Sequence, residues 1–200
     1  MKDKLIKDWE KLYQEEEVET MPWYRQGLDQ DFARALDDLG ISKGKALDIG
    51  AGPGTQAAAL AQLGFYVVGT DISKTATDKA SKKYGNCGLN VGFRQDDILN
   101  TKQVEKFDVI FDRGCFHILS PEQRPSYVRN VKKLLAAEGY LFLKVFSHLQ
   151  PGDEGPYRFS ETDLENALET GFKIKSFDAT IFEGNHTPPP KALFAILQPL

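Results

Sequence analysis

The chain has 200 residues, of which 41% are hydrophobic and 27% charged, and its formal net charge is −4. This composition is that of an ordinary soluble globular protein, and the length is enough for one domain with a sizeable core. No block of Lys or Arg stands out, which argues against nucleic-acid binding because phosphate contacts dominate that affinity. No apolar run approaches the roughly 20 residues that span a bilayer.

The N-terminus is polar and acidic, unlike a signal or transit peptide. Cys87 and Cys115 are the only cysteines, too few for a disulfide framework. Both features predict a reducing, cytoplasmic location. We expect a single domain over 1–200, with an N-terminal helical cap at 1–40 and a core at 41–200.

Two patterns alternate along the chain. Short apolar runs rich in Val, Ile, Phe and Tyr predict strands, and the stretches between them predict helices, several opened by a capping serine such as Ser73 or Ser160. Ser120 and Gln123 have the spacing of a capping box. In chain order, helices are expected at 2–17 and 28–40, a strand at 45–50, a helix at 55–64, strands at 65–71, 89–95, 107–112 and 140–146, and helices at 73–85, 120–139 and 160–171.

Strand–helix alternation predicts a parallel sheet with helices on both faces. The end of the chain breaks this rhythm. Two strands are expected at 172–184 and 191–197, with only NHTPPP between them, which is too short for a crossover helix. We therefore expect these two strands to form an antiparallel hairpin.

A glycine-rich turn follows the strand at 45–50. Gly50, Gly52 and Gly54 would let the backbone approach a ligand at the carboxyl edge of the sheet, where the next helix presents its positive N-terminus. The spacing is G-x-G-x-G rather than the dinucleotide pattern G-x-G-x-x-G, and Asp48 lies two residues before the first glycine. A carboxylate there would repel a pyrophosphate but would suit a ligand with amino and sulfonium groups. An NAD-dependent oxidoreductase is therefore a disfavoured alternative.

At this point the sequence resembles the class I S-adenosylmethionine-dependent methyltransferases. Their first motif is similar to D-x-G-x-G-x-G, matched here from Asp48 to Gly54, and their second is an acid that ends the second strand, here Asp71. Their third motif corresponds to Asp96 or Asp97, of which we favour Asp97, and their fourth to Asp112. The resemblance covers about residues 40 to 198.

The resemblance implies a Rossmann-like α/β fold with a seven-stranded sheet in the order 3-2-1-4-5-7-6, the last strand antiparallel, with helices on both faces and the helical cap. It implies S-adenosylmethionine as cofactor. Asp71 has a second interpretation, as a cap of the helix that follows it. The predicted cofactor-binding residues are Trp23, Asp48, Gly50, Ala51, Gly52, Gly54, Thr55, Asp71, Ile72, Asp97, Ile98 and Asp112.

Methyl transfer is an in-line displacement that depends mostly on positioning, and a base helps only when the acceptor carries a proton. His117 follows the fourth motif most closely, so it is the first candidate for a catalytic base or an acceptor anchor. No H-x-x-H or H-x-x-x-H spacing is present, and no metal is predicted. Loops at the same sheet edge supply the predicted acceptor-binding residues: Tyr24, Arg113, Cys115, Phe116, His148 and His186.

The fourth motif reads DRGCFH at 112–117, unlike the [DN]-P-P-[YF] of base and glutamine N-methyltransferases. With the short acidic chain, this run resembles the small-molecule group around thiopurine and tellurite-resistance methyltransferases. That group implies a small acceptor with a thiol sulfur or a heterocyclic nitrogen or oxygen, and no nucleic-acid or membrane partner. A protein-lysine methyltransferase and a noncatalytic S-adenosylmethionine-binding module remain alternatives. The acceptor and the oligomeric state stay open.

Overall fold

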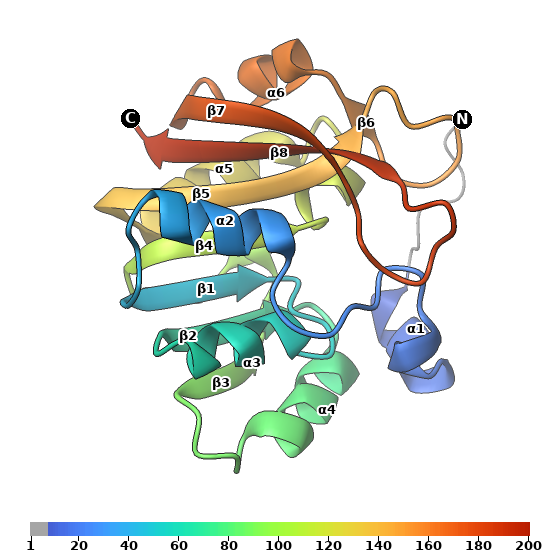
Figure 1. Cartoon of the computed structure of the whole chain (residues 1–200), viewed down its shortest axis with the longest axis vertical. Coiled ribbons are helices and arrows are strands. Elements are labelled where there is room, and N and C mark those ends of the chain that lie inside the picture. The colour runs from blue at the N-terminus through green and yellow to red at the C-terminus, as the bar shows by residue number, and fades with distance from the viewer. Residues whose placement is uncertain (1–7) are drawn as a thin grey trace.

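The computed structural model describes residues 8–200, and its centre is one mixed sheet (Figure 1). The strand order is β3-β2-β1-β4-β5-β8-β7, with the two-residue strand β6 beside β5. All neighbouring pairs are parallel except β5–β8 and β7–β8. The predicted order and the closing antiparallel hairpin are therefore confirmed. The strands are β1 Lys45–Ile49, β2 Tyr66–Asp71, β3 Val91–Gln95, β4 Phe107–Arg113, β5 Leu135–Ser147, β6 Arg158–Phe159, β7 Phe172–Ile181 and β8 Lys191–Pro199.

Helices cover both faces of the sheet. In Figure 1, α2, α3 and α4 lie in front of it and α5 lies behind it. Over residues 8–200, no helix has the length and apolar character needed to cross a membrane. The helices are α1 Trp9–Glu15, α2 Gln30–Asp38, α3 Thr55–Gln62, α4 Lys74–Tyr84, α5 Arg124–Leu134 and α6 Glu161–Leu168, with the 3₁₀ turns η1 Val18–Thr20, η2 Ile98–Asn100 and η3 Phe116–Ile118.

The hydrophobic core has one layer on each face of the sheet. On the α2–α3 face, Phe32 is fully buried, with its ring centroid 5.3 Å from that of Phe111 and 5.4 Å from that of Phe194. On the α5–α6 face, Tyr127 and Leu164 belong to a larger cluster of buried side chains. Because both faces are covered, the central strands are apolar along nearly their whole length.

The local capping signals are partly borne out. Ser73 Oγ accepts the Ala76 amide, and Ser160 forms a capping box with Asp163. The helix expected at 120–139 is shorter, because α5 begins at Arg124 and ends at Leu134. Of the predicted Ser120–Gln123 capping box, the Ser120 amide donates to Gln123 Oε1, but no side chain caps the start of α5.

The early end of α5 has a physical cause. Lys106 Nζ donates to the carbonyls of Lys133 (2.7 Å) and Leu135 (3.1 Å), which satisfies acceptors that a helix end leaves free. Leu135 then pairs with Phe107 across an irregular step in the β4–β5 ladder. The chain therefore enters β5 five residues earlier than its apolar pattern predicts.

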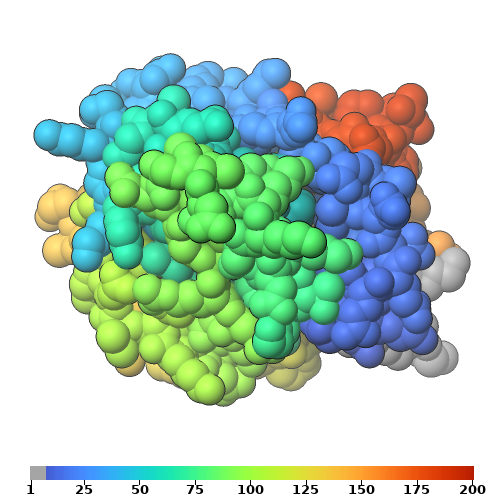
Figure 2. Space-filling model, turned by 90° about the horizontal axis from the view of Figure 1, so that it is seen from below, coloured from blue at the N-terminus to red at the C-terminus, as the bar shows by residue number. Residues whose placement is uncertain are grey.

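Two covering segments meet at the carboxyl edge of the parallel strands. One is the N-terminal segment, residues 8–29, and the other is the hairpin loop, residues 182–190. Asn185 joins them, because its amide nitrogen donates to the Glu19 (2.8 Å) and Met21 (3.0 Å) carbonyls. Figure 2 shows the N-terminal segment in blue against the green α4 region and beside the red hairpin loop. Part of the helix expected at 2–17 lies outside the described residues.

Candidate active site

A cavity of about 730 Å³ opens at this sheet edge. Its floor is the glycine turn after β1, its sides are the loops after β2, β3 and β4, and its roof is formed by the two covering segments. This is where open parallel sheets bind ligands, because the turns after neighbouring strands diverge there. All but four of the residues predicted to bind cofactor or acceptor line this cavity; the exceptions are Gly54, Asp112, Phe116 and His148.

The glycine turn needs glycine at each position for a measurable reason. Gly50, Gly52 and Gly54 have φ of +67°, +50° and +76°, which L side chains rarely adopt. A Cβ on Gly52 would lie 2.6 Å from Tyr13 Oη, and one on Gly54 would lie 2.6 Å from the Phe93 ring. Gly54 therefore serves packing behind the turn, while Gly50 and Gly52 face the cavity.

Asp48 is the least satisfied polar group of the site. Its Oδ1 accepts from Gln56 Nε2 at 3.1 Å, but Asp48 Oδ2 and Gln56 Oε1 are buried without a partner. Burial raises the pKa of Asp48 to about 7. Buried polar atoms are normally paired, so two orphan acceptors on residues that hydrogen-bond each other fit a cationic donor from a ligand.

Asp71 ties the glycine turn to the residue that caps α4, and its cofactor-binding role stays a prediction. Its Oδ2 accepts the Gly52 amide at 2.9 Å, which fixes the glycine turn, and its Oδ1 accepts the Ser73 amide at 2.8 Å, at the start of α4. Burial raises its pKa to about 6, against the lowering effect of these amides. The carboxylate lines the cavity and keeps free lone pairs, because each oxygen has two. Ile72 beside it is exposed.

The acids after β3 both line the cavity. Asp97 accepts the Leu99 amide and the Asn100 side-chain amide, each at 2.9 Å. Asp96 accepts from Thr101 Oγ1 and from the Lys102 amide. Since both carboxylates hold the loop and both reach the cavity, the choice of Asp97 remains a prediction.

Asp112 is a correction to the sequence interpretation, because it lies behind the cavity wall. It is fully buried, and its carboxylate accepts from the Cys115 amide (2.7 Å), the Phe116 amide (3.0 Å) and Tyr127 Oη (2.6 Å). Phe116 is a second correction, since its ring packs inside on Tyr127 rather than toward the cavity. Both residues shape the loop that carries His117.

Arg113 reaches the cavity wall, but its donors are directed into the protein. Nε donates to Asp29 at 2.7 Å, Nη1 to the Trp23 carbonyl at 3.2 Å, and Nη2 to the Glu183 carbonyl. Asp29 is fully buried and also pairs with Lys144. Arg113 therefore clamps both covering segments to the end of β4, a role different from the acceptor binding predicted for it.

His117 is buried in the cavity wall. Its Nδ1 accepts the Phe146 amide at 3.1 Å, and its ring lies 4.9 Å from that of Phe146 and 5.4 Å from that of Phe182. Burial, together with the positive charge of Arg113, lowers its pKa to about 3. The ring is neutral at physiological pH and, with Nδ1 accepting, carries its proton on Nε2. This arrangement does not suit the general base that was one of its two predicted roles.

The remaining histidines differ in position. His186, on the hairpin loop, lines the cavity, with Nδ1 2.8 Å from the Pro188 carbonyl. His148 is exposed and lies outside the cavity, apart from the other residues predicted to bind the acceptor. Cys115 lies in the wall, and burial raises the pKa of its thiol. Among residues 8–200, no group of three or more His, Cys, Asp or Glu side chains is placed to hold a metal ion.

Sequence reasoning missed Gln56 and the aromatic side chains of α1. Trp9 and Tyr13 line the cavity with the predicted Trp23 and Tyr24, and the Trp9 and Trp23 rings meet edge to face at 5.6 Å. Trp9 and Tyr13 are four residues apart, which places them on one side of a helix, and this spacing was the signal available in the sequence.

Glu10, on the same helix, anchors α1 to the start of α4. Its carboxylate accepts from Ser73 Oγ at 2.6 Å and from both the amide (3.1 Å) and the hydroxyl (2.6 Å) of Thr75. These bonds lock α1 above the glycine turn.

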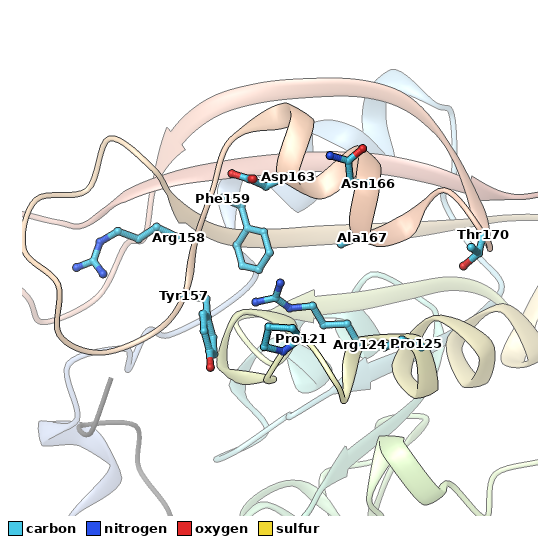
Figure 3. Close-up of a pocket in the computed structure, with 10 residues that line it drawn as sticks. All are labelled: Pro121, Arg124, Pro125, Tyr157, Arg158, Phe159, Asp163, Asn166, Ala167 and Thr170. Atoms are coloured by element: carbon cyan, nitrogen blue, oxygen red, sulfur yellow. The ribbon is translucent and has the colours of Figure 1, made fainter. Parts of the chain in front are cut away.

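A second hollow, of about 550 Å³, lies between α5 and α6 (Figure 3). The Arg124 guanidinium reaches into it, 4.7 Å from the Phe159 ring and 4.9 Å from the Tyr157 ring. Arg124 Nε also donates to the Leu119 carbonyl. These contacts give Arg124 a packing role behind the loop of His117, and we assign no ligand to this hollow.

The comparisons with known proteins agree with this geometry. A family model described as a methyltransferase domain matches residues 46–139. Thiocyanate methyltransferase 1 of Arabidopsis thaliana is 30% identical over 186 residues, which cover 92% of this chain and 79% of that protein. A probable thiol methyltransferase 2 of the same plant is 31% identical over 162 residues, covering 80% and 70%.

Solved structures share the fold. A structure described under the conversion of a disulfide bond into a thioacetal group during echinomycin biosynthesis superposes with a TM-score of 0.83 at 23% identity, covering 96% of this chain and 91% of its own. The strand order, glycine turn and strand-end acids define a class I methyltransferase. The chain belongs to the S-adenosylmethionine-dependent methyltransferases. It is an enzyme that methylates a small-molecule acceptor, and the protein-lysine and noncatalytic alternatives are not favoured.

Proposed function

We propose that this enzyme transfers the methyl group of S-adenosylmethionine to the sulfur of a small, soft nucleophile of the thiol or thiocyanate kind. The relatives named for thiocyanate and thiol methylation support this acceptor class. The observation that carries the proposal is the aromatic wall, which we define as His117, Phe146 and Phe182. These three rings pack on one another and line the cavity, and their only titratable member is a neutral imidazole.

The wall favours sulfur over a protonated nitrogen or oxygen. An ammonium or phenol acceptor needs a base at neutral pH, whereas a thiolate or thiocyanate ion arrives with a free lone pair. The cavity carboxylates lie near the end of β1, at the end of β2 and in the loop after β3, on elements other than those of the wall. Aromatic side chains also suit a polarizable acceptor without holding it by charge.

The cavity residues fit the cofactor. The orphan oxygens of Asp48 and Gln56 would accept from its ammonium group, and the open lone pairs of Asp71 from its ribose hydroxyls. Ile72 and Ile98 would pack against the base, with Asp97 at its amino group. The faces of Trp9 and Trp23 suit a sulfonium ion. When bound, the cofactor supplies a methyl group that is already electrophilic, so the protein needs to position and desolvate the acceptor.

Calorimetric titration with S-adenosylmethionine, and separately with NAD, tests the cofactor assignment. Micromolar binding of the first alone is expected. Turnover is then followed as S-adenosylhomocysteine released with thiocyanate, alkyl and aryl thiols, phenols, imidazoles and primary amines. Methylation of the sulfur acceptors at least tenfold faster than the others, in kcat/KM, is expected. Faster methylation of a phenol or an amine would contradict the acceptor class while leaving the cofactor assignment intact.

A further inference from the structure

The proton of His117 has a fixed position in this site. The backbone amide of Phe146 donates to Nδ1, so Nδ1 must present its lone pair, and a neutral imidazole then carries its single proton on Nε2. The ring cannot rotate freely, because it is held between Phe146 and Phe182 and is 5% exposed. His117 is therefore a hydrogen-bond donor of fixed direction.

Nε2 lies beside the cavity rather than in the core. A Cβ built on Gly114 would be 3.0 Å from Nε2, and both Gly114 and His117 line the cavity. A side chain at position 114 would crowd this N–H, which gives Gly114 of the DRG run a role. The donor thus faces the space where an acceptor would lie.

Burial, and then the positive charge of Arg113, lower the pKa of His117 and keep the ring neutral. The Arg113 guanidinium lies 5.4 Å and the Lys144 ammonium 5.7 Å from the centroid of Phe182, the ring that packs on His117. Glu183, next along the hairpin loop, is paired with Arg25 at 2.6 Å. Within residues 8–200, no carboxylate hydrogen-bonds the imidazole. Positive charge and burial both oppose a second proton on the ring.

We propose that His117 is the specificity-determining anchor of the acceptor, donating a hydrogen bond from Nε2 to an anionic acceptor atom and taking no proton from it. The inference rests on the proposed function, and it selects thiolate and thiocyanate ions over neutral thiols and amines. The acceptor's lone pair forms the new bond to the methyl carbon, and the bond from that carbon to the sulfonium sulfur breaks with its electron pair returning to sulfur. A thiol loses its proton to solvent before it binds.

Thiocyanate separates an anchor from a base, because it carries no proton at assay pH. H117F removes the donor and keeps an aromatic ring, and H117Q keeps an amide donor. With saturating cofactor, H117F should lower kcat/KM for thiocyanate by about 10- to 100-fold, the usual factor for losing a hydrogen bond to a charged group, while H117Q retains most activity. Cofactor affinity should be unchanged in both. H148F, at an exposed histidine outside the cavity, is the matched control and should behave as wild type.

A base would give the opposite pattern: thiocyanate turnover unaffected by H117F, and thiol turnover lost in H117F and H117Q alike. That result would overturn the inference. If H117F fails to bind the cofactor, the wild-type pH profile decides. At saturating cofactor, kcat/KM for thiocyanate should not change with pH, and kcat/KM for each thiol should rise with pH through the pKa of that thiol. A loss of activity at low pH with the same apparent pKa for thiocyanate and thiols would refute the role of His117 as an anchor. Cofactor binding without turnover of thiocyanate or any thiol would instead refute the proposed function.

Discussion

Cofactor binding should expel a proton from Asp48. In the unliganded cavity, burial favours the neutral carboxyl and raises its pKa to about 7. A ligand ammonium beside the orphan Oδ2 stabilises the ionised form and returns the pKa toward the ordinary value of 3.8. At pH 6.5, about three quarters of the free molecules carry this proton and almost none of the bound ones do, so Asp48 releases about 0.75 proton per binding event.

The sign of the pH dependence follows from the same equilibrium. Protonated Asp48 must lose its proton before it can pair with the ammonium, so affinity rises with pH through the pKa of the free protein. Between pH 6 and pH 7, where an α-amino group stays protonated, the dissociation constant should fall by about fivefold, or about 1 kcal/mol. Above that range the ligand amine itself begins to titrate and the trend flattens.

Calorimetry in two buffers of different ionisation enthalpy at pH 6.5 measures the released protons directly. Asp48→Asn keeps an acceptor oxygen but removes the titration, so the release should drop to what Asp71 contributes. With a pKa of about 6, Asp71 is protonated in only about a quarter of molecules at this pH. Equal proton release by wild type and Asp48→Asn would refute the assignment of the ammonium to Asp48.

Three further changes test other parts of the structure. Gly52→Ala adds a Cβ 2.6 Å from Tyr13 Oη at a φ of +50°, so cofactor affinity measured by calorimetry should fall by tenfold or more. Gly64→Ala is the control, because Gly64 also has a positive φ but lies in open space, and it should leave the affinity unchanged. In Arg113→Lys, a single ammonium cannot bond to both covering segments, so KM for the acceptor in steady-state assays should rise more than Kd for the cofactor in binding assays. Equal increases in KM and Kd would contradict the proposed role of Arg113 in holding both segments. Phe32→Ala should lower the free energy of unfolding in urea by about 3–5 kcal/mol, and a loss under 1 kcal/mol would show that the core closes around the gap.

The fold and part of the site could be predicted because they depend on patterns among residues that are close in sequence. Strand and helix periods, the short NHTPPP link and the spacing of three glycines depend only on neighbouring residues, and each led to the observed arrangement. The role of Arg113 could not be read in this way, because its partners Asp29 and Glu183 lie 84 and 70 residues away in the chain. Likewise, nothing near His117 in sequence reveals that the amide of Phe146 occupies Nδ1.

Three acids follow the same local pattern, at or near the carboxyl end of a parallel strand, yet they differ in how many internal donors reach them. Asp112 accepts from two backbone amides and a tyrosine hydroxyl, and it is sealed inside. Asp71 accepts two amides at the cavity wall, and Asp48 accepts a single neutral side-chain amide and keeps a buried oxygen unpaired. Donors supplied by the protein reduce what a carboxylate gains from a ligand, because its desolvation cost is already offset. Asp48 is therefore left with the fewest internal donors and Asp112 with the most, which supports our proposal that the cationic end of the cofactor binds at Asp48 and not at Asp112.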